Sequence, residues 1–386
     1  MKKRKICVVI TSRGNYAKMR SFIDEASKSD EIELAIIVGG GAVLPKYGDI
    51  VSELHHLKKK VNRVVHFLVE GETPQTMAKS AGLAVLDFAN AFENLQPDIV
   101  IVIADRFECL PIAIAATYMN IPIAHVEGGE VTGSIDESVR HAITKMSHYH
   151  FPATRDAAKR IERLGENPEY IFEIGCTSLD VIAGMDLEDM TPIVEYQETG
   201  HGVGAKLDPN DPYLVVIQHP VTTEYSENLK HVNETINAID SLGINTFWIW
   251  PNMDAGSDGI SKGIRVYREN RKPEHLHFFR SCPIECYAPL LYNAKCIVGN
   301  SSSGIREAAF MGVPCVNIGT RQNGRDRGAN VVDVGYDQAE ISKAVEDQLG
   351  AGRYEPDYLY GKGDAGRAMA EVLAGVNLYC QKRITY

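Results

Sequence analysis

The sequence lacks the common signatures of cofactor and metal sites. The first predicted strand is followed by Thr-Ser-Arg-Gly-Asn-Tyr instead of GxGxxG, and no P-loop lysine occurs, so neither NAD nor ATP is indicated. The eight cysteines stand at positions 7, 109, 176, 282, 286, 296, 315 and 380 without a CxxC pair, which argues against structural zinc. We therefore expect reduced thiols in a cytoplasmic protein that uses no metal and no cofactor.

Long hydrophobic runs and an excess of positive charge are also missing. No apolar stretch approaches the roughly 18–20 residues that span a bilayer. Ile6–Ile10 is too short for the core of a signal peptide, so a first strand is expected there. Forty Lys and Arg against 51 Asp and Glu give a net charge of -11, which disfavours a polyanionic partner. We expect neither a membrane nor a nucleic acid as partner, although a few local donors would be enough to bind a small phosphate ligand.

Short apolar runs alternate with helical patterns along the 386 residues, a length that favours two domains. Helices are predicted at Ala17–Ser29, Pro74–Leu95 and Glu108–Met119. Runs that are apolar on both faces are typical of parallel strands covered by helices. The runs of the first half are KICVVIT, IELAIIV, VVHFL, DIVIVIA and IPIAHV.

A second series of strands follows a segment of different composition. Residues 181–212 are rich in Gly, Pro and acids and are expected to be a linker or irregular. The later runs are YLVVIQ, NTFWIW, LHFF, AKCIVG and PCVNIG. We predict an α/β fold with two Rossmann-like, doubly wound parallel-sheet domains, residues 1–180 and 181–364, and a cleft between them. In such sheets ligands bind beyond the carboxyl ends of the strands.

Charged side chains follow the first and fourth predicted strands. Arg13 comes after the first strand, where it reaches an anion or lies at the surface. Asp105 and Arg106 come directly after DIVIVIA, at an edge where sheets place their chemistry. The alternative for Asp105 is that it caps the next helix.

The fifth predicted strand leads into the most polar segment of the chain. His125, Glu127 and Glu130 gather around two glycines that would let a ligand approach. Asp136 and Arg140 are four residues apart on the following helix and share one face, either as part of a site or as a solvated ion pair. Carboxylates held together raise one another's pKa, which suits the removal and return of a proton.

In the second half, polar motifs again follow strands. His219 comes after YLVVIQ and either binds or protonates a phosphate leaving group or is only a turn residue. The stretch GNSSSGIRE (299–307) offers serine hydroxyls and free N–H groups at a helix start, where an anion can bind, although serine is also an ordinary N-cap. Glu307 would suit the hydroxyls of a ribose. Three arginines in 320–327 either bind the same ligand or are ordinary charged residues of a loop.

These motifs resemble, in the same order, those of the hydrolysing UDP-N-acetylglucosamine 2-epimerases. The matching stretches are HVEGGEVTGSIDESVRHAITKMSHYHF (125–151), QHPVTTE (218–224), PNMDAGS (251–257), GNSSSGIREAAFMGVP (299–314) and GTRQNGR (319–325). The resemblance implies a GT-B-like pair of Rossmann domains, with residues 365–386 packing back on the first domain. It also implies a UDP-sugar substrate, elimination of UDP to 2-acetamidoglucal, addition of water to give N-acetylmannosamine, no metal or redox cofactor, and a homodimer or homotetramer.

Position by position, the resemblance assigns roles to particular residues. The residues that it places in catalysis are Asp105, Glu127, Asp136, Arg140 and His219. The residues that it places in substrate binding are Arg13, Arg106, Ser301, Ser302, Glu307 and Arg321.

Three departures from the family pattern leave the substrate open. Ile103 and Ala104 stand where the family usually has His-Gly, Ala42 where it often has a histidine, and Ala17 where it has a serine. The sugar and the base are therefore uncertain from sequence, and UDP- or GDP-linked diacetylbacillosamine is the alternative substrate.

Two other functions compete with epimerisation. A GT-B glycosyltransferase would use a UDP-sugar and an acceptor, but the carboxylates of 127–137 are not needed for that reaction. A catalytically inactive sensor of sugar nucleotides is favoured only by the missing histidines. Arg265 and Arg268 resemble arginines that in animal relatives take part in feedback by CMP-sialic acid, and they equally suit an ordinary basic helix face.

Overall fold

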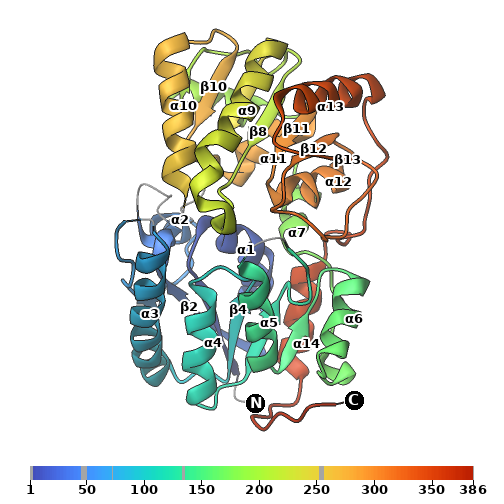
Figure 1. Cartoon of the computed structure of the whole chain (residues 1–386). Helices are drawn as coiled ribbons and strands as arrows, with labels where there is room; N and C mark the ends of the chain where they lie inside the picture. The colour runs from blue at the N-terminus through green and yellow to red at the C-terminus, as the bar shows by residue number, and fades with distance from the viewer. Residues whose placement is uncertain (1–2, 45–49, 72, 133–134, 252–255, 386) are drawn as a thin grey trace. The chain divides into compact units, whose positions relative to one another are not determined.

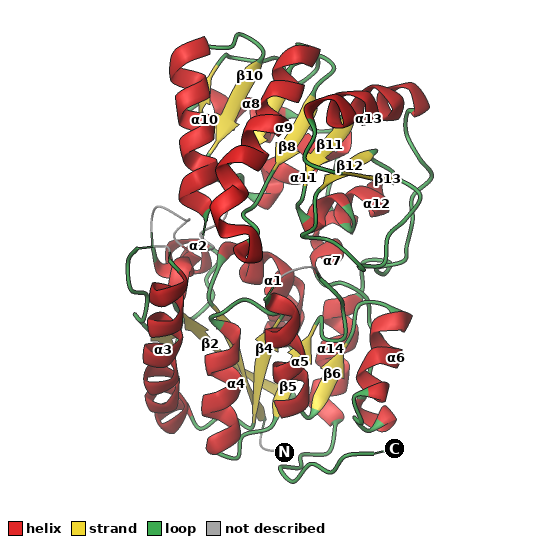
Figure 2. Ribbon diagram, viewed as in Figure 1, coloured by secondary structure: helices red, strands yellow, loops and turns green. Residues whose placement is uncertain are grey.

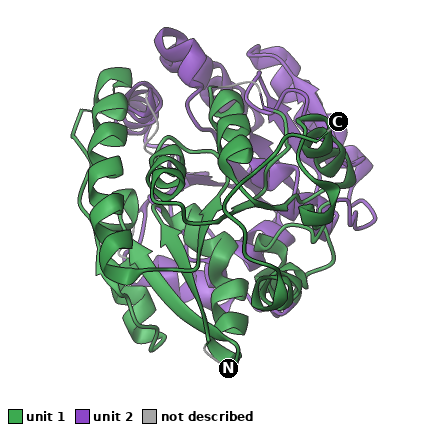
Figure 3. Cartoon of the chain, turned by 90° about the horizontal axis from the view of Figure 1, so that it is seen from below, with its two compact units in different colours: residues 1–131, 135–183, 360–386 green, residues 132–134, 184–359 purple. Residues whose placement is uncertain are grey.

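The computed structural model describes residues 3–44, 50–71, 73–132, 135–251 and 256–385. The chain divides into two compact units (Figures 1 and 3). Unit 1 comprises residues 1–131, 135–183 and 360–386, and unit 2 comprises residues 132–134 and 184–359. The polypeptide therefore leaves unit 1 after residue 183 and re-enters it at residue 360.

Unit 1 is built on a six-stranded sheet in the order β3-β2-β1-β4-β5-β6, with every neighbouring pair parallel. The strands are β1 Arg4–Ile10, β2 Ile32–Val38, β3 Arg63–Val64, β4 Ile99–Ile103, β5 Ile123–Val126 and β6 Tyr149–Phe151. Successive residues of β1 enter different cores, with Ile6 and Val8 in one and Cys7 and Val9 in the other. Both faces of the sheet are therefore buried, as the continuous apolar runs predict.

Helices cover both faces of this sheet (Figure 2). Helices α1 (Arg13–Lys28) and α14 (Ala365–Gly375) pack together and supply Phe22 and Leu373 to the first core. Helices α3 (Pro74–Leu95) and α4 (Cys109–Tyr118) supply Phe88 and Ile112 to the second. Each such side chain stabilises the fold by roughly 1.5–3 kcal/mol when fully buried. The remaining helices are α2 Ile50–His56, α5 Asp136–Met146, α6 Arg155–Arg163, α7 Ser178–Ala183 and the 3-10 turns η1 Gly40–Val43 and η3 Pro168–Tyr170.

Unit 2 contains a seven-stranded sheet in the order β13-β12-β11-β8-β9-β10-β7, in which only β7 is antiparallel among the described strands. Its strands are β7 Val203–Gly204, β8 Leu214–Ile217, β9 Thr246–Ile249, β10 Leu276–Phe279, β11 Cys296–Gly299, β12 Cys315–Ile318 and β13 Val331–Val334. Its helices are α8 Thr191–Glu198, α9 Asn228–Leu242, α10 Ser257–Arg271, α11 Ile284–Asn293, α12 Glu307–Met311 and α13 Gln338–Ala351, with the 3-10 turns η4 Thr222–Glu227 and η5 Ser302–Gly304. The side chains of α9, α10 and α13 share one core with the central strands.

Several predicted elements differ from the structure. Helix α1 begins at Arg13, not at Ala17, because the Ser12 hydroxyl accepts the Asn15 N–H at 3.2 Å and caps the helix there. Of the strand expected at VVHFL (64–68), only Val64 lies in a strand, the two-residue β3, which begins at Arg63. Residues 181–212 contain α8 and β7 instead of being irregular. The edge strand β13 was not predicted. Among the described residues, no helix is both long enough and apolar enough to cross a bilayer.

The order of strands identifies where each unit can bind a ligand. In unit 1 the order reverses between β1 and β4, and in unit 2 it reverses between β8 and β11. Doubly wound sheets bind ligands at the carboxyl ends of the strands beside such a switch point. The residues that follow these four strands are therefore the first place to look for a site.

Candidate active site

The neighbouring strands β4 and β5 end in the same unusual backbone conformation. Ala104 follows β4 with φ +58°, and Glu127 follows β5 with φ +62°. The Ala104 N–H donates to the Val126 carbonyl at 2.9 Å, and the Glu127 N–H donates to the Phe151 carbonyl at 2.9 Å. A left-handed residue other than glycine costs roughly 1–2 kcal/mol, and such strain is often retained where it serves a site. These turns bring Asp105 and Glu127 to one edge of the sheet.

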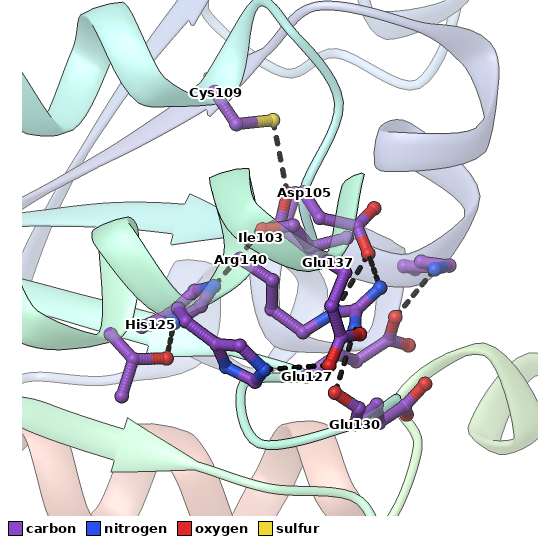
Figure 4. Close-up of polar contacts among 12 residues, drawn as sticks. Ile103, Asp105, Cys109, His125, Glu127, Glu130, Glu137 and Arg140 are labelled. Carbon is purple, nitrogen blue, oxygen red and sulfur yellow. Dashed lines mark hydrogen bonds and ion pairs between the residues drawn. The ribbon is translucent and has the colours of Figure 1, made fainter. Parts of the chain in front are cut away.

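A buried arginine, Arg140, holds the partly exposed Asp105 in an ion pair (Figure 4). The guanidinium, from α5, donates to Asp105 Oδ2 from Nε at 2.8 Å and also from Nη2. Its Nη1 donates to the Glu130 carbonyl at 2.7 Å and to Glu137 Oε2 at 2.9 Å. Burial alone would lower the pKa of Arg140, but Asp105, Glu130 and Glu137 outweigh burial and raise that pKa above its ordinary value. Arg140 is therefore a permanent cation beside Asp105.

Glu127 is held by two residues that the sequence did not single out. Its Oε2 accepts from Lys18 Nζ at 2.5 Å, and its Oε1 lies 3.2 Å from the Cys176 thiol that donates to it. The Glu127 side chain is only 1% exposed. The thiol is also 3.1 Å from the Ser178 hydroxyl. The carboxylate is thus fixed by groups from α1 and from the segment before α7.

His125 is a neutral, buried link between β4 and α5. Its Nε2 lies 3.0 Å from the Ala104 carbonyl, and its Nδ1 lies 3.1 Å from the Thr144 hydroxyl. A carbonyl only accepts, so Nε2 carries the proton and Nδ1 accepts from the threonine. Burial is the main reason that the pKa of His125 is lowered to about 4. The imidazole therefore stabilises the turn before Asp105 in its uncharged form.

Arg13, Arg106 and Asp136 are the other predicted residues of unit 1. Asp136 is half-buried in the first turn of α5, and Arg13 Nη2 lies 3.8 Å from Glu53 Oε2. Arg106 pairs with the fully buried Glu108 at 3.3 Å. Glu108 is the N-cap position of α4, so Asp105 does not cap that helix. Residues 133–134 of the long polar motif lie outside the described residues.

In unit 2, loops after three adjacent strands meet at Asn300. The His219 N–H donates to Asn300 Oδ1 at 2.6 Å, and Asn300 Nδ2 donates back to the His219 carbonyl at 2.9 Å. Arg321 Nη1 donates to the Asn300 carbonyl at 3.3 Å. The predicted residues His219 and Arg321 are therefore brought to one place, by a residue that was not predicted.

The serine stretch forms a tighter turn than a regular helix start. Ser301 Oγ accepts the Ser303 N–H at 3.3 Å and caps η5, which contains Ser302 and is followed by α12 of only five residues. Ser303 is joined to Tyr287 by a hydroxyl contact of 2.5 Å. Burial, and then the charge of Glu307, raise the pKa of Tyr287. Ser301 and Ser302 are half-buried, as is Glu307.

The departures from the family pattern are largely core positions. Ile103 is 2% exposed and Ala42 is fully buried, and both belong to the first core of unit 1. Ala17 is half-buried on α1. Ala104, which stands where the family usually has glycine, adopts the left-handed conformation that glycine favours. The sequence therefore differs from the family pattern at Ala104 while the backbone there is one that a glycine would also adopt.

The remaining candidates belong neither to the group of residues after β4 and β5 nor to the loops that meet at Asn300. Arg265 is exposed and Arg268 half-buried on α10, and of PNMDAGS the residues 252–255 lie outside the described residues. The chain has two histidine-rich stretches, SHYHF (147–151) and HLHFF (275–279), which contain the strands β6 and β10. Within the described ranges, no group of three or more His, Cys, Asp or Glu side chains is arranged to hold a metal ion.

Two Rossmann-like α/β units with charged and hydroxyl side chains at their switch points define the class of protein. It is a GT-B-like protein with ionic groups suited to proton transfer in one unit and cationic and hydroxyl-bearing loops in the other. The family model of UDP-N-acetylglucosamine 2-epimerase matches residues 24–374, and the chain belongs to this family.

Individual relatives agree with this assignment. The chain is 34% identical over 381 residues to the UDP-N,N'-diacetylbacillosamine 2-epimerase (hydrolyzing) of Legionella pneumophila, covering 98% of this chain and 97% of that protein. It is 30% identical over 388 residues to a UDP-N-acetylglucosamine 2-epimerase of Neisseria meningitidis, covering 99% and 98%. A crystal structure of UDP-GlcNAc 2-epimerase from Neisseria meningitidis bound to UDP-GlcNAc superposes with a TM-score of 0.79 at 17% identity, over 96% of this chain and 99% of that chain. The expected family and the GT-B-like α/β fold class are confirmed.

Proposed function

We propose that this chain is a hydrolysing 2-epimerase of a UDP-linked 2-acetamido sugar, with UDP-N-acetylglucosamine as its substrate. Membership of the family supports the reaction class. The observation that carries the chemistry is the pair of ion-paired carboxylates, Asp105 and Glu127, that follow β4 and β5. Transfer of the sugar to an acceptor would not need a base at C2, so these groups favour epimerisation over glycosyl transfer.

The first step is elimination of UDP. We assign Asp105 as the base that accepts the C2 proton. Arg140 beside it is a permanent cation that does not give its own proton to Asp105, so the carboxylate stays available as a base. The electron pair of the C2–H bond forms the C1=C2 double bond, and the C1–O bond breaks, with its electrons leaving on the β-phosphate of UDP. The products of this step are UDP and 2-acetamidoglucal.

The second step is hydration of the glucal. Water supplies hydroxide to C1, and a proton is added to C2. This proton arrives on the face opposite to the one from which the first step removed a proton, which gives the manno configuration. In the Lys18–Glu127 pair, the ammonium Nζ lies 2.5 Å from Glu127 Oε2 and carries a transferable proton that suits this delivery. Asp136 is the third carboxylate, assigned to the attacking water. The overall change is UDP-N-acetylglucosamine plus water to N-acetylmannosamine plus UDP.

Recognition of UDP is assigned to charged groups and hydroxyls at the strand ends. In unit 2, His219 and Arg321 suit the leaving diphosphate, and the half-buried Glu307 suits the ribose hydroxyls. In unit 1, Arg13 and Arg106 are further cations for the phosphates. The serine hydroxyls assigned to UDP are those of Ser301 and Ser302.

A second candidate substrate is the diacetylbacillosamine nucleotide, linked to UDP or GDP. The relative with 34% identity carries this activity in its name, and the relative with 30% identity is named for UDP-N-acetylglucosamine. Ile103 and Ala42 also place apolar side chains where the family usually has histidines. In diacetylbacillosamine an acetamido group replaces the hydroxyl at C4 and C6 is a methyl group, so the sugar has fewer hydroxyls. A chain without these histidines would lose fewer hydrogen bonds with such a sugar.

Parallel assays distinguish these substrates. The purified chain is incubated with UDP-N-acetylglucosamine and with UDP- and GDP-diacetylbacillosamine, and the nucleotide and free sugar released are measured by chromatography. The proposal predicts the highest kcat/KM for UDP-N-acetylglucosamine, with UDP and free N-acetylmannosamine in equal amounts. A higher kcat/KM for diacetylbacillosamine nucleotides would establish the second candidate. UDP-N-acetylmannosamine as the product would mean a non-hydrolysing enzyme, and tight binding without any product would mean a sensor.

A further inference from the structure

Asn300 lies at the switch point of unit 2, where β8 and β11 run side by side. Gly299, the last residue of β11, pairs with Ile217 of β8. At Gly299, φ is +130° and an added Cβ would lie 2.0 Å from the Ile217 carbonyl, so only glycine permits this approach. The Asn300 N–H then donates to the same carbonyl at 3.0 Å. The side chain of Asn300 is thereby placed against the loop that leaves β8.

The Asn300 side chain binds both main-chain groups of His219. Its Oδ1 accepts the His219 N–H at 2.6 Å, and its Nδ2 donates to the His219 carbonyl at 2.9 Å. Asn300 is 1% exposed and His219 is half-buried, so these bonds lie partly out of reach of water. An amide can accept and donate at once, whereas a carboxylate only accepts and a hydroxyl is too short to span both groups.

The main chain of Asn300 joins a third loop to the same point. Its carbonyl accepts from Gln322 Nε2 at 2.8 Å and from Arg321 Nη1 at 3.3 Å. Gln322 is 1% exposed and follows β12. One buried residue therefore connects the loops after β8, β11 and β12.

We propose that Asn300 is a positioning residue for nucleotide binding, acting by fixing His219 and Arg321 beside the serine turn. The inference rests on the proposed function, which assigns those two residues to UDP. Asn300 does not contact the nucleotide in this account, because its Oδ1, Nδ2 and carbonyl oxygen are all bound within the protein. The side chain of Asn300 acts on UDP through the orientation of His219, whereas Arg321 is held by the main-chain carbonyl, which a substitution of the side chain leaves in place.

The test is UDP binding by titration calorimetry with Asn300→Ala, His219→Ala and the double variant. Asn300→Ala is expected to weaken UDP binding about ten-fold, within the range of coupling between contacting residues. The UDP affinity of the double variant is expected to equal that of whichever single variant binds UDP less tightly. The two losses do not add, because the side chain of Asn300 acts through His219. The near-isosteric Asn300→Asp, which cannot donate to the His219 carbonyl, is expected to lose at least as much and serves if the alanine variant does not fold.

Asn293→Ala is the matched control in the same unit. Asn293 Nδ2 also donates to main-chain carbonyls, those of Leu187 at 2.9 Å and Pro289 at 3.0 Å, but none of these residues is assigned to the nucleotide. Its UDP affinity should stay within two-fold of the wild type, with a comparable change in Tm.

Two results would overturn the inference. One is UDP affinity of the Asn300 variants within two-fold of the wild type, and the other is a double variant whose loss is the product of the two single losses. Wild-type protein that binds UDP without turning over any sugar nucleotide would contradict the proposed function and not the role of Asn300. Wild-type protein that does not bind UDP would overturn both.

Discussion

Arg140 donates two hydrogen bonds to one oxygen of Asp105, from Nε at 2.8 Å and from Nη2 to the same Oδ2. The arginine side chain is 1% exposed, while that of Asp105 is 16% exposed. The cation is thus buried behind a carboxylate that keeps some access to solvent. The planar guanidinium fixes the direction of Asp105, which a lysine would not do. This arrangement suits a base that must meet a sugar carbon in one orientation.

Replacement of Asp105 separates catalysis from nucleotide binding. Asp105→Asn keeps an acceptor for Arg140 but removes the base, so kcat is expected to fall by roughly two to four orders of magnitude. UDP affinity should change less than two-fold, because UDP recognition is assigned mainly to unit 2. Steady-state kinetics and calorimetry measure both quantities, and Asp347→Asn, at a side chain 71% exposed, is the control. Near-normal turnover of Asp105→Asn would refute the assignment of the base.

The Cys176 thiol is expected to tune Glu127. Cys176→Ala removes the donor at 3.2 Å from Oε1, which disfavours the ionised carboxylate. The expected result is a kcat lowered several-fold and an acid limb of the pH–rate profile moved to higher pH. Cys176→Ser should restore most of the rate, because a hydroxyl also donates. Cys7→Ala, which removes a fully buried thiol from β1, should leave the profile unchanged. An identical profile for Cys176→Ala would show that the thiol only fills space.

Stability should decrease as the solution is acidified through the histidine range. The pKa of His125 is lowered to about 4 from 6.5, chiefly by burial, so folding favours the neutral ring. The resulting stability is present above about pH 6.5 and is lost as the pH falls toward 4. For His125 alone this amounts to about 3 kcal/mol. Burial also lowers the pKa of the following histidines: His148, His150, His231 and His277.

Urea unfolding between pH 7.5 and 4.5 measures this dependence. The wild type should keep its free energy of unfolding from pH 7.5 to about 6.5 and lose it progressively below that pH. His125→Ala should be less stable at pH 7.5 and should show a smaller slope with pH. Equal slopes for the two proteins would mean that folding does not shift the pKa of His125, which would contradict its burial as a neutral ring.

A buried carboxylate attaches the C-terminal segment to the rest of unit 1. Glu166, 3% exposed, accepts from Lys145 Nζ and Lys382 Nζ at 2.6 Å each and from His150 at 3.1 Å. Burial opposes ionisation, but these donors outweigh it and lower the pKa of Glu166 to about 2. Glu166→Gln leaves both lysines without their anion and should cost about 3 kcal/mol of unfolding free energy.

The exposed pair Lys343–Asp347 provides the comparison. Its side chains are 74% and 71% exposed, so Asp347→Asn should change stability by less than about 0.5 kcal/mol. Denaturation in urea at pH 7 gives both values. Equal effects of the two substitutions would contradict the structural role of Glu166.

The buried strands were predictable because their residues are apolar on both faces. The run DIVIVIA contains β4, and all five residues of this strand are buried. The missed strand β13 has exposed residues at its centre, so no continuous apolar run reveals it. The strand β7 is only two residues long and lies at the sheet edge. Short edge strands are defined by their neighbours and not by local composition.

The residues of the candidate site were predicted mainly from their places after strands, with Asp136 and Arg140 predicted from their shared face of a helix. Asp105 and Glu127 stand directly beyond β4 and β5, and this position alone marks them. Lys18 and Cys176 are 109 and 49 residues from Glu127, and only the fold brings them together. Asn300 lies inside a motif that drew attention through its serines, and its role depends on a loop 81 residues away.

The central claim is that this chain removes and returns the hydrogen at C2 of a UDP-sugar. Proton NMR of the purified protein with UDP-N-acetylglucosamine in deuterium oxide tests it directly. The account predicts free N-acetylmannosamine with deuterium at C2, formed together with UDP. A released sugar that keeps its original hydrogen at C2, with the gluco configuration, would contradict it.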